Sequence, residues 1–290
     1  MKILISIITV IYFSVRAQSF IIHDTHAHGL AGIAGGSFYD ALSGSYNPAS
    51  LGKIDAPDFA FFYTNYFPEH TLIAGGIAFP LKGYGGISIG YFRNSIIDGE
   101  QGDVTFRTHY INIGYGREIF KNLHVGINGI YYKLMFLNLS NYPDFTEQAE
   151  ALDFALFYSS FTSVFILDNV SVGIIGKHLL QVYDEEALLK ETRFIAEKKV
   201  DISRSVITLL FNYRYGQPVA TGWEEDFIYG LDYAYQQFYL STGYCTSNKY
   251  IAFGGGVYIS KFTLGYSYGK FNYQSDNFSP HHTLSFTVHL

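Results

Sequence analysis

Two neighbouring stretches near the end of the chain decide the fold: residues 262–269 read FTLGYSYG, and residues 283–290 read TLSFTVHL. In both, a bulky apolar residue alternates with a small or polar one. Phe262, Leu264 and Tyr266 share one face of an extended chain, with threonine and glycine between them. A period of two predicts β-strands that have two chemically different faces.

The same period runs through most of the chain upstream, where the opposite face carries mainly Gly, Ser and Ala. The bulky positions include Ile87, Ile89, Tyr91, Phe227, Tyr229, Leu231, Tyr233, Tyr235, Ile251, Phe253, Val257 and Ile259. A soluble β-sandwich usually covers its outer face with full charges. An apolar face opposite a small, weakly charged one instead favours an all-β transmembrane antiparallel β-barrel, with lipid outside and small side chains inside. The alternative is a secreted β-sandwich that buries its aromatic residues between two sheets.

Composition excludes several other classes of protein. Of the 290 residues, 18% are aromatic and only 15% are charged, against about 25% charged in an average soluble domain. After the first 17 residues no apolar run approaches the ~18 residues of a membrane-spanning helix. The net charge of −6, without a Lys/Arg cluster, argues against a nucleic-acid partner. Cys245 is the only cysteine, which excludes a disulfide framework.

Alternation and turn residues predict thirteen strands, and the requirement for an even number of strands predicts one more. The expected strands are 58–65, 71–80, 83–94, 105–116, 122–136, 152–166, 170–181, 201–214, 226–235, 237–246, 250–259, 262–271 and 282–290. Bacterial barrels have an even number of strands, and the strand directions place a short, degenerate one around residues 217–223. We therefore expect fourteen strands, or twelve if a weaker one is a loop.

The connections predict the orientation of the barrel. Residues 81–82, 118–121, 167–169 and 260–261 form short periplasmic turns, whereas 95–104, 137–151, 182–200 and 272–281 form long outer loops. In residues 184–198, acids and bases alternate around apolar positions. This segment is either a short amphipathic helix that caps the barrel or a solvated loop.

The N-terminus has the pattern of a secretory signal peptide. Lys2 precedes an apolar run, and Val15-Arg16-Ala17 supplies small residues for cleavage after Ala17. The alternative is a short buried strand. The expected organisation is a signal peptide over 1–17, an N-terminal plug segment over 18–57 and an outer-membrane barrel over 58–290.

Residues 18–57 do not alternate like a strand. A run of small residues over 29–36 permits close packing inside another structure, and Asn47-Pro48 indicates a turn that opens a short helix. These features predict a segment that lies inside the barrel.

The run Gly29 to Gly52 carries Asp40-Ala41 and Tyr46-Asn47-Pro48-Ala49-Ser50-Leu51. It resembles the N-terminal signature of the FadL-like outer-membrane proteins, especially the PorV/PorQ branch, although Ser50 stands where that branch has Gly. Segments 229–233, 238–244, 254–256 and 282–286 are also similar to that branch, in the same order. The chain ends on Leu290 rather than on the terminal aromatic residue common in such barrels.

The resemblance implies one of two activities in the outer membrane, where lipid surrounds the barrel. As a PorV-like protein, the chain is a component of type IX protein secretion, with secretion-machinery proteins as partners. As a FadL-like protein, it takes up hydrophobic small molecules, which leave by rearrangement of the plug or through a gap in the wall. Of the two, the PorV-like role is the leading expectation. A general polar porin is disfavoured, because a plug and small apolar residues leave little room for water.

Candidate site residues follow from the plug and from one strand. Asp40, Tyr46, Asn47 and Pro48 are the expected plug and ligand-gating residues. Asp232, between glycine and aromatic positions, is expected to face the lumen and to pair with a base from the plug.

Catalytic and metal chemistry are not expected. His109, His124 and His289 lie on different predicted strands, without a Gly-x-Ser-x-Gly motif. His23, His26 and His28 have spacing that suits a transition metal, but a polar, flexible mature N-terminus is the favoured explanation. The sequence thus predicts a non-enzymatic protein without a cofactor.

Overall fold

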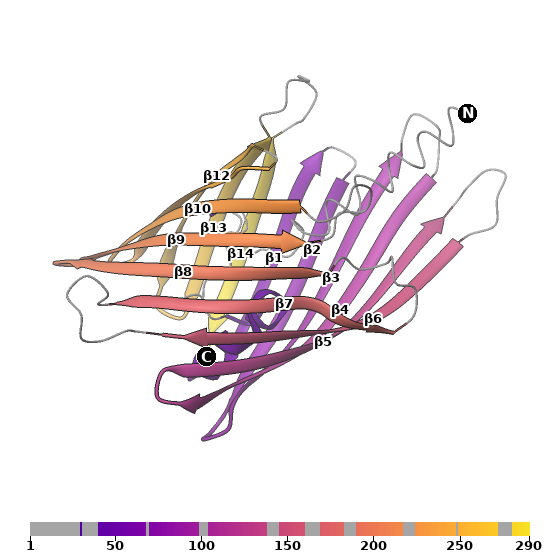
Figure 1. The fold of residues 1–290 in the computed structure, drawn as a ribbon. Coiled ribbons are helices and arrows are strands. Elements are labelled where there is room, and N and C mark those ends of the chain that lie inside the picture. Colours follow the sequence, from indigo (N-terminus) through magenta and orange to yellow (C-terminus); the bar gives the residue numbers. More distant parts are fainter. Residues whose placement is uncertain are drawn as a thin grey trace.

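The computed structural model describes Leu30 and residues 40–67, 70–98, 104–137, 145–159, 169–182, 190–216, 224–247, 249–271 and 280–290 (Figure 1). Two short helical segments, α3 (Ser43–Tyr46) and η1 (Pro48–Lys53), precede the strands. The strands are β1 (Asp58–Phe67), β2 (His70–Leu81), β3 (Gly85–Asp98), β4 (Val104–Phe120), β5 (Leu123–Leu137), β6 (Phe145–Tyr158), β7 (Val170–Val182), β8 (Glu191–Ile202), β9 (Ser205–Gly216), β10 (Glu224–Tyr235), β11 (Phe238–Cys245), β12 (Tyr250–Ile259), β13 (Phe262–Phe271) and β14 (His281–His289).

The strands form one closed barrel. Each pairs antiparallel with its neighbours in sequence, and β1 closes the sheet against β14, with Phe61 opposite Phe286. Closure leaves no free sheet edge among these strands, which is how a sheet can stand in lipid. The predicted fourteen-stranded antiparallel barrel is confirmed.

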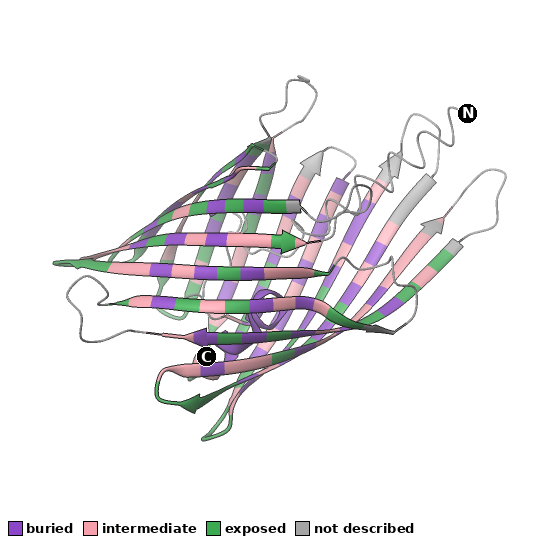
Figure 2. Cartoon of the chain, in the orientation of Figure 1, coloured by how far each residue is buried: buried purple, intermediate pink, exposed green. Residues whose placement is uncertain are grey.

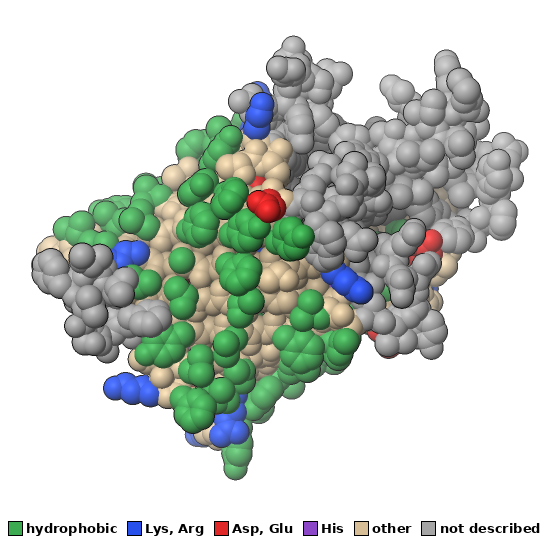
Figure 3. Space-filling model, viewed as in Figure 1, with side chains coloured by type: hydrophobic (Ala, Val, Ile, Leu, Met, Phe, Trp, Pro, Cys, Tyr) green, Lys and Arg blue, Asp and Glu red, His purple; other side chains and the backbone are tan. Residues whose placement is uncertain are grey.

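The two faces of the wall differ as the alternation predicted. On β10, Phe227, Tyr229 and Leu231 are exposed on the outside, whereas Ile228 and Asp232 are buried on the inside. Buried and exposed positions alternate along the strands in Figure 2, and hydrophobic side chains are spread over the wall in Figure 3. An apolar outer face of this kind suits contact with lipid. No helix in the described part of the chain is long and apolar enough to cross a membrane.

Short hairpin turns join β2 to β3, β4 to β5, β8 to β9, β10 to β11 and β12 to β13 at one end of the barrel, which we call the turn end. Left-handed residues shape these turns: Gly83, Gly85, Asn122, Ser203, Gln236 and Ser260 all have positive φ, as tight hairpins require. β1 begins and β14 finishes at this end, with Leu290 N–H bonded to Pro57 O at 2.9 Å. We call the opposite end the loop end.

The expected loop over 182–200 is wrong for residues 191–200, which lie in β8. The charged residues over 191–200 belong to a strand rather than to a solvated loop or a helix. Arg193 and Glu197 point inward and are buried, while Phe194 points outward. The expected strand 201–214 is confirmed over residues 205–214, which lie in β9, whereas a turn at Ser203 leaves residues 201–202 in β8.

β8 is therefore the strand that parity required, and the degenerate strand expected at 217–223 lies outside the described residues. β6 begins at Phe145 rather than at residue 152, which shortens the expected loop over 137–151.

Candidate functional site

Residues 40–57, here called the interior segment, pack against the inner face of β2–β6. Glycines make this contact possible. A Cβ on Gly116 would lie 2.2 Å from Pro48 O, and one on Gly126 would lie 2.2 Å from Ala49 N. The backbone of η1 thus rests directly on the backbones of β4 and β5, at a distance that only glycine permits.

Asp40 organises the first turn of the interior segment. Its Oδ1 accepts hydrogen bonds from Leu42 N–H at 2.8 Å, from the Tyr46 hydroxyl at 2.9 Å and from the Ser43 hydroxyl at 3.2 Å. Tyr46 is only 1% exposed. Two of the predicted gating residues therefore contact each other, and one carboxylate holds the α3 turn closed.

Asn47 and Pro48 form the junction between α3 and η1. Pro48 occupies the first turn of η1, where its missing N–H costs no helical hydrogen bond. Ser50 Oγ donates to Asn47 O at 2.7 Å, which closes the junction. All four predicted residues of the N-terminal site thus lie within the interior segment, three of them fully buried.

Asp58, the first residue of β1, ties the interior segment to the closing strands. Its Oδ2 accepts a hydrogen bond from Ala41 N–H at 3.1 Å. Its Oδ1 lies 2.9 Å from His289 Nδ1 on β14, directly opposite in register. The segment is therefore fastened where the barrel closes on itself.

A chain of buried polar side chains runs from the interior segment across three strands. Ser45 Oγ donates to Asn112 Oδ1 at 3.0 Å, and Asn112 Nδ2 donates to Asn128 Oδ1 at 3.1 Å. Asn128 Nδ2 then donates to Asp153 Oδ2 at 3.1 Å. Each group is satisfied by the next, which is the condition for burying such a network.

The chain returns to its start through a bulge in β7. The β6–β7 register shifts between Leu152 and Phe154, and His178 has a φ of 53°. His178 N–H donates to Asp153 Oδ1 at 2.7 Å, and Lys177 Nζ donates to Ser45 O at 2.8 Å. The bulge thus aims Lys177 at the interior segment, and the contacts form a closed ring through β4, β5, β6 and β7.

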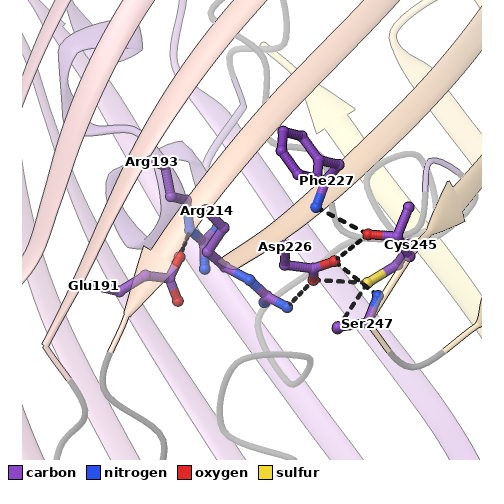
Figure 4. Close-up of polar contacts among 8 residues, drawn as sticks. Glu191, Arg193, Arg214, Asp226, Phe227, Cys245 and Ser247 are labelled. Atoms are coloured by element: carbon purple, nitrogen blue, oxygen red, sulfur yellow. Dashed lines mark hydrogen bonds and ion pairs between the residues drawn. The ribbon is translucent and has the colours of Figure 1, made fainter. Parts of the chain in front are cut away.

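Beyond this ring, charged residues continue around the wall (Figure 4). Arg193 on β8 and Arg214 on β9 lie directly opposite each other. Glu191 pairs with Arg193, and Asp226 on β10 pairs with Arg214. The carboxylates offset the repulsion between the two guanidinium groups, which would be costly in a buried site.

Asp226 also accepts three hydrogen bonds from the end of β11 and the residues after it. The donors are Cys245 Sγ–H at 2.9 Å, the Thr246 hydroxyl at 3.0 Å and Ser247 N–H at 3.0 Å. Cys245 is fully buried in this arrangement, where a thiol is inert. The cluster therefore holds β8 to β11 together.

Apolar groups line two sides of the interior. On one side, Phe92 lies between Phe62 and Tyr110, with ring centroids 6.1 Å and 5.4 Å away, and Leu42 joins the same cluster. On the other side, Leu30 packs with Leu210, Ile228, Cys245, Tyr250 and Ala252. The N-terminal chain thus contacts opposite sectors of the wall. Aromatic side chains with few polar groups, such as Phe62 and Phe92, form a surface that suits contact with an apolar molecule.

Lys53 is the last residue of η1. Its Nζ lies 4.5 Å above the centre of the Phe157 ring. Burial lowers the pKa of Lys53 to about 8, and Lys199 acts in the same direction, while Glu197 and Glu118 oppose the shift.

Asp232 lies on the inner face of β10, opposite Ser241 and Thr208, and is 4% exposed. The interior segment's helices contact β2–β6, so the structure does not bring Asp232 together with the four predicted N-terminal residues.

The sequence reasoning missed the buried charges and amides of the inner wall: Asn112, Asn128, Asp153, Lys177, Arg193, Arg214 and Asp226. Part of the signal was available, because Asn112 shares its strand face with Gly114 and Asn128 shares its strand face with Gly126.

Within the described residues, no three His, Cys, Asp or Glu side chains gather as a metal site. The expected signal peptide and His23, His26 and His28 lie outside the described residues.

A closed antiparallel barrel, apolar outside and small or polar inside, defines the class of protein: this chain has the fold of an outer-membrane β-barrel. No protein-family model and no curated protein sequence matches it.

Solved structures of similar fold cover nearly the whole chain. The toluene transporter TbuX of Ralstonia pickettii has a TM-score of 0.63 at 8% identity, over 93% of this chain and 99% of that one. The toluene transporter TodX of Pseudomonas putida has a TM-score of 0.59 at 10% identity, over 92% and 96%. A FadL homologue of Pseudomonas aeruginosa has a TM-score of 0.57 at 9% identity, over 91% and 97%. The fold is thus that of FadL-like barrels.

Proposed function

We propose that this protein carries small hydrophobic molecules across the outer membrane. The observation that carries the proposal is the interior segment, which lies within a FadL-like barrel and packs its apolar side chains against lumen-facing aromatic rings. An apolar molecule that enters the barrel meets surfaces of its own kind there, and it does not have to remain in water.

In this proposal the interior segment is the plug, and it must shift for a molecule to pass. Hydrogen bonds from Ala41 to Asp58, from Ser45 to Asn112 and from Lys177 to Ser45 hold it in place. Each is worth about 1 kcal/mol, or more where a charge takes part. The interior segment is kept folded as one unit by Asp40, Tyr46, Asn47 and Pro48. These residues gate passage because they determine the shape of the segment.

The secretion role implied by the PorV/PorQ resemblance receives no support from the similar structures, two of which, TbuX and TodX, are named as toluene transporters. Hydrophobic transport is therefore the function we propose. Co-purification of the full chain with large secretion proteins, together with cargo accumulation on deletion, would overturn this choice.

A reversible crosslink tests the gating. A Cβ on Gly44 would lie 2.2 Å from Ser88 Oγ, so cysteines at these two positions are within reach of a disulfide. We expect cells that express Gly44→Cys/Ser88→Cys to take up labelled toluene and oleate poorly when oxidised. Reductant should restore uptake to the level of the two single-cysteine controls.

Two results would contradict the proposal. Equal uptake by the oxidised and reduced double variant means that the segment does not gate. If wild-type cells take up neither probe faster than cells without the protein, transport of hydrophobic molecules is itself wrong.

A further inference from the structure

Four basic side chains gather on the outside of the barrel, toward the loop end of β3–β5. Arg93, His109 and Lys133 lie directly opposite one another in register. Arg107 lies two positions before His109 and so faces the same way. The alternate residues Phe92, Tyr110 and Tyr132 are buried on the inside, which places these four, here called the basic row, on the lipid-facing surface.

Exposed apolar side chains cover the outer face of β3–β5 on the turn side of the basic row. Toward the turn end, the same face carries the exposed Ile89, Tyr91, Ile111 and Ile113, and Tyr84 is exposed in the hairpin turn that precedes β3. Arg93 follows Tyr84 by nine residues (93 − 84). At ~3.3 Å per residue and a tilt of ~40°, this is about 23 Å of height. An apolar band of an outer-membrane barrel is about 25 Å tall, so the basic row lies at the level of lipid headgroups.

The charges of the basic row are not neutralised by the described protein. His109 Nδ1 lies 2.7 Å from the Tyr91 hydroxyl. Over the described ranges, no ion pair involves Arg93, Arg107 or Lys133, and Arg107 Nε is buried without a hydrogen-bond partner. Among the described residues, the nearby acid on the same face is Glu150, which lies opposite Tyr131 and closer to the turn end. Three permanent cations against this carboxylate give these four described groups a net charge of +2 (3 − 1).

We propose that the basic row binds the phosphate monoester headgroup of a membrane lipid, whose acyl chains lie along the apolar wall below. A phosphate monoester carries about −1.5 to −2 charges at pH 7 and three acceptor oxygens, which matches the uncompensated charge. Arginine presents paired donors that suit phosphate oxygens. Ile111, Ile113 and Tyr91, directly below the row, offer the surface for the acyl chains. This binding is independent of what passes through the barrel.

Native mass spectrometry of the full-length barrel in neutral detergent tests the proposal. The probes are phosphatidic acid, a phosphate monoester, and phosphatidylglycerol with the same acyl chains, a phosphate diester. We expect wild-type protein to bind phosphatidic acid at least tenfold more tightly. Arg93→Gln/Arg107→Gln/Lys133→Gln should lose at least tenfold of that affinity, and the single variant Lys133→Gln should lose part of it.

The matched control is Lys82→Gln/Lys121→Gln/Arg204→Gln, which removes three exposed cations at the turn end and should bind as wild type does. Unchanged binding by the basic-row variants, in protein that keeps the heat-modifiable gel mobility of a folded barrel, would overturn the proposal. Equal affinity for the two lipids would also overturn it. If inorganic phosphate alone binds as tightly as phosphatidic acid, the acyl chains contribute nothing and the lipid assignment is wrong.

Discussion

At the scale of the residue, glycines on the inner wall determine how deeply the interior segment lies. A Cβ at position 126 would lie 2.2 Å from both Ala49 N and the Pro48 carbonyl carbon. These are backbone atoms, which cannot turn aside as a flexible side chain can. We expect Gly126→Ala to destabilise the docked segment by about 1–3 kcal/mol, the usual cost of overpacking. Limited proteolysis should then cut residues 40–57 of the variant faster than those of wild type.

The matched control is Gly129→Ala on the same strand. A Cβ there meets its nearest atoms only at 3.8 and 3.9 Å, because Gly129 faces outward. This variant should be cut at the wild-type rate. Equal cutting of the two alanine variants would show that the backbone contact at Gly126 does not hold the segment.

At the scale of the element, η1 carries Lys53, whose positive charge opposes the docking of η1 against the inner wall of the barrel. Burial lowers the pKa of Lys53 to about 8 from 10.5, so the undocked state binds more protons between these values. The free energy of unfolding should therefore rise as pH increases from 8 to 10.5, and below pH 8 the full penalty applies. Urea unfolding at pH 7.5, 9 and 10 should show a smaller rise for Lys53→Met than for wild type. Identical pH profiles would contradict this assignment.

The strand β8 shows why the sequence predicted the type of fold better than the details of its inner wall. Alternation identifies a strand easily when its inner face is glycine or serine, as on β13. On β8 that face carries Arg193 and Glu197, and charges in an amphipathic pattern usually indicate a solvated surface. Inside a barrel they are held by ionic partners, such as Glu191 for Arg193 on the same strand. Partners on neighbouring strands, such as Asp226 for Arg214, lie twelve residues apart in sequence, so single-chain patterning does not reveal the pairing.

The candidate site likewise has one part that the sequence predicted and one part that it did not. Asp40, Tyr46, Asn47 and Pro48 are close in sequence, and the turn at Asn47-Pro48 together with the family resemblance grouped them. The ring from Ser45 to Lys177 joins residues 132 positions apart, and it depends on a bulge in β7 that has no clear sequence signal. Barrel closure, rather than local preference, brings these groups together.

At the scale of the whole molecule, the barrel and the interior segment have separate tasks. The wall is complete without the segment, because every described strand finds both partners in other strands. The segment instead fills space inside, against one sector formed by β2–β6, while Leu30 contacts the sector of β9–β12. It follows that removing the segment should open the barrel rather than unfold it.

We therefore expect deletion of residues 18–53 to leave a folded barrel that conducts ions steadily in a planar lipid bilayer, whereas the full-length protein conducts little. The inner wall exposed by the deletion carries Asn112, Asn128, Asp153 and Lys177, which water solvates readily. A synthetic peptide of residues 18–57 should reduce the current of the deletion variant, and a scrambled peptide should not. If the deletion variant has folded-barrel mobility on gels yet is as silent as the full-length protein, the interior segment is not what closes the lumen.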